Sequence, residues 1–112
     1  MSDRTLLEMA AKAAGYTCVW RGNDGDFWWH VDPDYERPWN PLSDDGDALR
    51  LAVNLKIGVC WWSDATVFSE YYGIDDDDGH RQLINESGNG LDEAATRRAI
   101  VRAAAAIWEK MP

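Results

Sequence analysis

The chain is poor in the residue types from which catalytic and metal-binding motifs are usually built. It contains two cysteines and two histidines in 112 residues. No pair of them has the Cys-x-x-Cys or His-x-x-x-His spacing of a zinc site. No serine has the Gly-x-Ser-x-Gly context of a hydrolase nucleophile. The sequence therefore predicts no catalytic residue, no metal ligand and no cofactor, and we interpret the protein as not an enzyme.

Long hydrophobic runs and excess positive charge are also lacking. No apolar stretch approaches the roughly 18 residues of a membrane-spanning helix, and the pattern of a secretory signal is not seen at the start. We therefore expect a cytoplasmic protein that does not act at a membrane. Eleven Lys and Arg oppose 20 Asp and Glu, which gives a net charge of −9. This balance disfavours direct binding to nucleic-acid phosphates.

Hydrophobic periodicity predicts one α+β domain over residues 1–112. Helical patterns cover residues 3–14, the region from 44 to about 56, and the closing segment after Asp92. Strand patterns cover 16–21, 26–32, 57–62, 66–72 and, less clearly, 80–85. The order is α-β-β-α-β-β-β-α. We expect a mainly antiparallel sheet of about five strands packed with three helices in an αβα sandwich.

The second predicted helix carries strong local signals. Ser43 is a suitable N-cap, and the aspartates that follow it complement the helix dipole. Pro38 and Pro41 favour extended backbone before it. The predicted core-facing stripe of this helix consists of Ala48, Leu51, Ala52 and Leu55, widened by Leu49 and Val53.

Three stretches of the sequence resemble the phage ABA sandwich domain family. They are the Trp-Asn-Pro-Leu-Ser-Asp-Asp-Gly-Asp-Ala-Leu-Arg-Leu-Ala run of residues 39–52, residues 94–105 and residues 6–15. The resemblance covers nearly the whole chain. It implies a bacteriophage or prophage protein, present in the infected bacterial host, with a sheet between helices. It implies no established activity and no catalytic residues.

An acidic turn, Asp75-Asp76-Asp77-Asp78-Gly79, is one candidate for function. An EF-hand alignment on Gly79 fails, because it places Ile74 and Asn85 at the first and last ligand positions. A solvated turn, a weak cation site and an acidic contact for a basic partner stay open as interpretations.

Adjacent tryptophans in two predicted strands, Trp28-Trp29 and Trp61-Trp62, are the other candidate. Successive strand residues point to opposite faces of a sheet, so each pair sends one indole to either side. Either helices cover both faces, or an aromatic patch is exposed as a dimer or partner surface.

These features lead to one functional hypothesis and one alternative. The hypothesis is a phage-encoded, anti-CRISPR-like inhibitor that occludes a basic groove of a host protein or nucleoprotein complex. The alternative is an accessory protein that sequesters a nucleotide-type ligand or acts as a homodimeric interaction module. The predicted partner-binding residues are Asp64, Glu70, Asp75, Asp76, Asp77, Asp78, Trp62, Tyr72 and Trp28.

Overall fold

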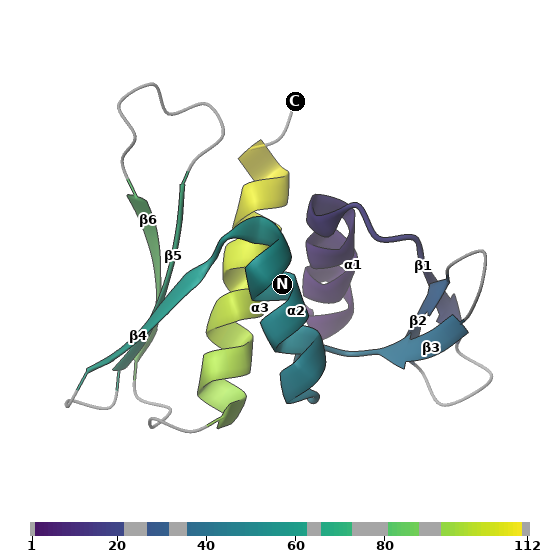
Figure 1. Ribbon diagram of the computed structural model, residues 1–112, viewed down its shortest axis with the longest axis horizontal. Helices are drawn as coiled ribbons and strands as arrows, with labels where there is room; N and C mark the ends of the chain where they lie inside the picture. Colours follow the sequence, from purple (N-terminus) through teal and green to yellow (C-terminus); the bar gives the residue numbers. More distant parts are fainter. Residues whose placement is uncertain are drawn as a thin grey trace.

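In a computed structural model of the chain, the described residues form three helices and six strands (Figure 1). It describes residues 2–21, 27–31, 36–62, 66–72, 81–87 and 93–110, with side chains for 2–20, 36–59 and 93–110. The helices are α1 (Asp3–Ala14), α2 (Asp45–Leu55) and α3 (Glu93–Lys110). The strands are β1 (Cys18–Arg21), β2 (Phe27–Val31), β3 (Glu36–Trp39), β4 (Gly58–Trp62), β5 (Thr66–Tyr72) and β6 (Arg81–Ser87).

The strands form two separate antiparallel sheets, one in the order β1-β2-β3 and the other in the order β4-β5-β6. Figure 1 shows the sheets on opposite sides of the three helices. In the first sheet, Trp28 pairs with both Trp20 and Trp39. In the second, Glu70 pairs with Gly58 and Leu83, and β5 and β6 contact α3.

The predicted αβα sandwich with a single sheet of about five strands is therefore wrong. Helices make up 67% of the residues whose side chains are described, and they lie between two sheets instead of on both faces of one. Alternating hydrophobicity identifies individual strands but not which strands pair. Here each strand pairs only with its neighbours in the chain, and α2 separates β3 from β4.

Strand β3 was not predicted, although Pro38 and Pro41 favour extended backbone in this region. Pro38 is compatible with this strand because β3 is at the edge of its sheet, where only every second N–H points to the neighbouring strand. Trp39 ends the strand and is 1% exposed, so it joins the helical core. Tyr16 packs edge-on against the Trp39 ring, with ring centroids 5.9 Å apart, and the Arg4 guanidinium lies over the Trp20 ring. These contacts attach the first sheet to the helices.

Helix α1 confirms the prediction for residues 3–14. The Ser2 hydroxyl accepts a hydrogen bond from the Thr5 N–H and caps its start. Gly15 ends it in the left-handed region at φ 75°, and its N–H donates to the Ala11 and Lys12 carbonyls. Both ends thus follow the expected capping chemistry.

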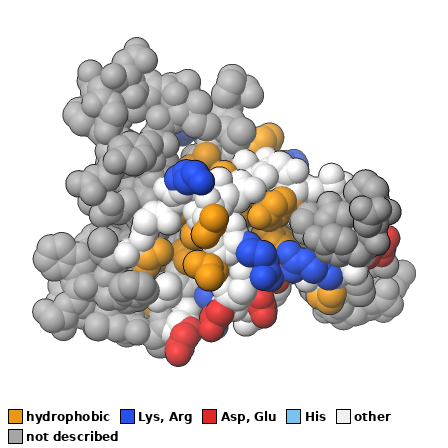
Figure 2. Space-filling model, in the orientation of Figure 1, with side chains coloured by type: hydrophobic (Ala, Val, Ile, Leu, Met, Phe, Trp, Pro, Cys, Tyr) orange, Lys and Arg blue, Asp and Glu red, His pale blue; other side chains and the backbone are white. Residues whose placement is uncertain are grey.

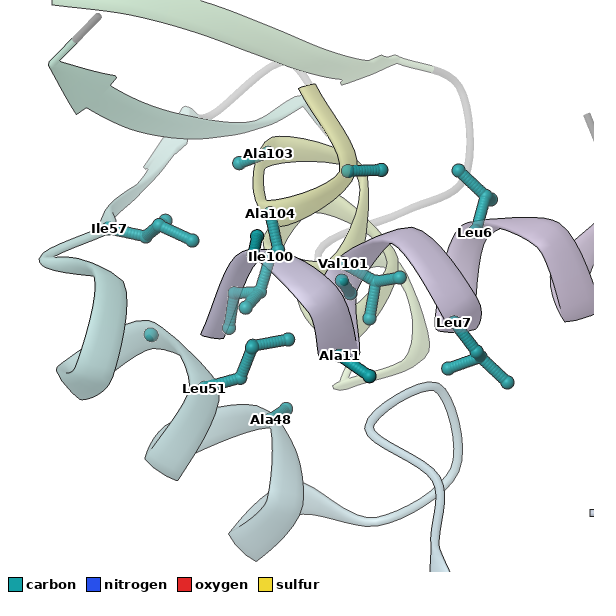
Figure 3. Packing of buried hydrophobic residues seen from close by; sticks show 14 of the residues in the cluster. Leu6, Leu7, Ala11, Ala48, Leu51, Ile57, Ile100, Val101, Ala103 and Ala104 are labelled. Carbon is teal, nitrogen blue, oxygen red and sulfur yellow. The ribbon is translucent and has the colours of Figure 1, made fainter. Parts of the chain in front are cut away.

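Helix α3 lies in the middle of the molecule and contacts α1, α2 and the second sheet. Close approach on several sides requires small side chains, and Ala99, Ala103 and Ala104 are fully buried. Ile100, Val101, Ala104 and Ile107 of this helix are also buried, whereas Trp108 is half-buried. Figure 3 shows Leu7 and Ala11 of α1, Leu51 of α2 and Val101 of α3 around this shared interior.

Helix α2 begins one residue later than predicted, because its N-cap is Asp44 and not Ser43. The Asp44 carboxylate accepts a hydrogen bond of 2.8 Å from the Asp47 N–H. Asn40 holds the preceding turn, with its side-chain oxygen accepting from the Leu42 N–H. The helix ends at Lys56, which is left-handed at φ 59°. Ser43 lies within the turn that Asn40 stabilises, and Asp44, the residue after it, caps the helix instead.

Candidate docking groove

Helices α2 and α3 and the start of β4 enclose an open groove of about 770 Å³. Aliphatic side chains from all three elements line most of it, and charged side chains stand at its ends. The lining residues are Asp45, Ala48, Leu49, Ala52, Val53, Lys56, Ile57, Val59, Glu93, Thr96, Arg97 and Ile100.

Two large apolar side chains on α2 are exposed at this groove. Leu49 is 64% exposed and Val53, one turn later, is 61% exposed. The buried residues of this helix are Asp47, Ala48, Leu51 and Ala52. The prediction that Leu49 and Val53 widen the core-facing stripe is therefore wrong. Figure 2 shows hydrophobic side chains gathered on this face, with acidic side chains below them and basic ones above and beside them. Two exposed apolar side chains beside an apolar groove make this face the candidate interaction site.

An ion pair joins α2 to α3 at one end of the groove. The Arg97 Nη1 donates to Asp45 Oδ1 at 2.5 Å, and its Nε donates to the Leu42 carbonyl at 2.9 Å. Glu93 stands at the same end. At the other end, Lys56 is exposed, and its Nζ makes a long contact of 3.4 Å with the Val53 carbonyl. The groove is therefore more acidic at the helix N-termini and basic near Lys56.

A polar cluster lies on the other side of α2, around the buried carboxylate of Asp47. Arg37 of β3 donates to its Oδ1 at 2.6 Å, and Arg50 donates to the same oxygen at 2.9 Å. The Asn40 N–H donates to Oδ2 at 3.0 Å. Burial raises the pKa of Asp47, but these three hydrogen bonds outweigh it and hold the pKa below its usual value.

Tyr16 lies next to this cluster, and its pKa is shifted in the opposite direction. Burial raises its pKa above the usual value, and the hydrogen bond with Asn54 and the charges of Arg37 and Arg50 offset only part of that effect. Both pKa shifts move away from neutrality, whereas an efficient general acid or base titrates near the working pH. The cluster therefore favours a structural anchor between β3 and α2 over a proton-transfer site.

The partner-binding residues predicted from the sequence fall largely on parts of the chain without described side chains. Asp64 and Asp75 to Asp78 lie outside the described residues. Trp62 and Tyr72 pair with Thr66 and Arg81, near opposite ends of the second sheet and roughly 20 Å apart along β5. Glu70 also lies on β5, whereas Trp28 belongs to the first sheet. The backbone thus spreads this set over both sheets, and its binding role stays a prediction.

Among the described residues, no group of three or more His, Cys, Asp and Glu side chains is placed to hold a metal ion. Within the same residues, no helix is both long and apolar enough to cross a membrane.

The chain matches no family model, no curated protein and no solved structure. The resemblance to the phage ABA sandwich family therefore stays a prediction, and the groove itself carries the functional interpretation.

The groove residues had a signal in the sequence that the core assignment overlooked. Positions 48, 49, 51, 52, 53 and 55 together span about 200° of the α2 circumference, about twice the width of an ordinary core-facing stripe. An apolar arc of that width has a second side that the core does not cover. The anchor role of Asp47 had no comparable signal, because its partner Arg37 lies in a strand that the sequence did not predict.

Proposed function

We propose that the protein is a non-enzymatic binding module that docks an apolar protein segment in the α2–α3 groove. The exposure of Leu49 and Val53 at a groove lined by further aliphatic side chains carries this proposal. Removing such side chains from water is the main favourable term in protein association. Charged residues at both ends of the groove provide the polar rim typical of such interfaces.

The lining chemistry disfavours a nucleotide-type ligand. The phosphates of such a ligand need several hydrogen-bond donors, whereas the groove offers mainly Ala, Leu, Val and Ile side chains. The guanidinium of Arg97 already donates to Asp45 and to the Leu42 carbonyl. Sequestration of a nucleotide is therefore the weaker alternative.

The net charge of −9 supports a second version, in which the protein inhibits a host complex by occupying a basic groove. Its contacts would come from the acidic turn at Asp75 to Asp78. Charge reversal of these four residues tests it. We expect weaker and less salt-sensitive binding to a basic host complex; unchanged, salt-insensitive binding would refute this version.

Site-specific photocrosslinking in the bacterial host tests the docking groove. A photoreactive phenylalanine replaces Leu49 in one variant and the exposed Lys12 of α1 in a matched control. We expect a protein adduct from position 49 that is lacking from position 12. If position 49 yields no adduct although the variant is folded, the groove is not a docking surface.

A further inference from the structure

Four groove residues lie in one stripe along α2, in the order acid, apolar, apolar, base. Asp45, Leu49 and Val53 follow at successive intervals of four residues, and Lys56 comes three residues later. At 100° per residue they fall within about 80° of the helix circumference. All four are exposed.

In the opposite direction the same stripe runs base, apolar, apolar, acid, so it is complementary to an antiparallel copy of itself. If two copies of α2 pack antiparallel, Asp45 of each faces Lys56 of the other, and Leu49 faces Val53. Both pairs are centred near Arg50 and Leu51, so one twofold axis satisfies them together. A twofold interface requires this kind of self-complementary surface. On the basis of the proposed docking function, we infer that the occupant of the groove is a second copy of this chain, bound through an antiparallel α2–α2 contact.

The groove provides a place for the second copy's apolar side chains. Ile100 of α3 and Val59 of β4 line it beside α2, so a Leu49 or Val53 side chain that enters it contacts aliphatic surface on three elements. The α2 helix is about 16 Å long, and the stripe spans that length.

The end charges are available to a second copy. The Asp45 side chain is 71% exposed although it pairs with Arg97, so solvent-facing lone pairs remain for Lys56 of the other chain. Asp45, Glu93, Lys56 and Arg97 sum to zero charge, whereas the whole chain carries −9. Repulsion between copies thus originates outside the groove, and moderate salt screens it.

Sedimentation equilibrium over a concentration series, at moderate salt, tests the inference. We expect a monomer–dimer equilibrium whose dissociation constant rises at least roughly ten-fold in Leu49→Asp, since a charge then enters the apolar contact. Thr17→Asp adds the same charge at an exposed site outside the groove and should leave the constant unchanged. A chain that stays monomeric into the millimolar range overturns the inference, and so does a dimer that Leu49→Asp does not weaken.

A charge-exchange experiment tests the antiparallel register. In Asp45→Lys, lysines face each other at both ends of the contact, and in Lys56→Glu acidic side chains do, so each variant alone should be mainly monomeric. An equimolar mixture restores both attractive pairs and should form a heterodimer. Circular dichroism checks that both variants are folded. If the variants are folded and the mixture does not associate, the register is wrong.

The crosslinking product separates this inference from the proposed function. An adduct of twice the chain mass from position 49 supports self-pairing. An adduct with a different protein, together with a monomeric purified chain, leaves the docking groove in place and overturns self-pairing alone.

Discussion

Removing the buried carboxylate of Asp47 should destabilise the fold more than removing any exposed acid. The residue is 4% exposed and accepts three hydrogen bonds, two of them from guanidinium groups. Deleting one partner of a buried ion pair costs about 3–5 kcal/mol. Arg50 is 57% exposed and Arg37 30% exposed, so both cations regain water and the loss lies at the low end of that range. We expect Asp47→Ala to cost about 3 kcal/mol.

Urea unfolding followed by tryptophan fluorescence measures this loss as a lower midpoint at unchanged slope. Asp3→Asn is the matched control, because it removes an ion pair outside the groove whose carboxylate is mostly exposed and should cost no more than about 1 kcal/mol. If Asp47→Ala costs as little as Asp3→Asn, the cluster is not an anchor.

Three further predictions concern pH, the α1 cap and the core. Because the folded pKa of Asp47 is depressed, its stabilisation is complete above the unfolded pKa of about 3.9 and is lost as pH falls through the folded pKa. Acid titration of unfolding should show that loss in the native protein and a smaller one in Asp47→Asn. Gly15→Ala should cost about 1 kcal/mol although the added methyl meets nothing within 4 Å, since φ is 75°; a melting temperature equal to that of the native protein would contradict this. Ala103→Leu should cost about 1–3 kcal/mol by overpacking a fully buried site, whereas the same change at the exposed Ala94 should be nearly neutral in denaturant titrations.

The helices could be predicted from the sequence because their signals are local. Ser2, Gly15 and the apolar spacing of residues 6–13 determine α1 within the chain segment itself. The five predicted strands were also found close to their expected positions. How the strands assemble into sheets was not predictable in the same way, because it depends on which other strands can pair with the edge of each strand. In the meander β4-β5-β6 each strand pairs with the strand next to it in the chain, so it forms without a strand from the first sheet.

The candidate site was less predictable than the fold because it depends on the rotation of α2 about its axis. Periodicity identifies a helix with an apolar arc but not which part of a wide arc faces the core. Contacts distant in sequence decide that point, namely Arg37 with Asp47 and Arg97 with Asp45. One of these contacts begins in β3, a strand that the sequence did not predict.

These two contacts also explain why Leu49 and Val53 remain exposed although a rotation of α2 about its axis would turn them toward the core. Turning α2 inward on that side would withdraw Asp47 from Arg37 and from the Asn40 N–H, which leaves charges and donors unpaired at a cost of several kcal/mol. It would also expose Leu51, which is fully buried. Fully burying two aliphatic side chains gains about 3–6 kcal/mol at most, and the exposed Leu51 would offset part of that gain. The polar anchor and the Arg97 pair therefore fix an apolar surface toward solvent, which is the arrangement that a docking surface requires.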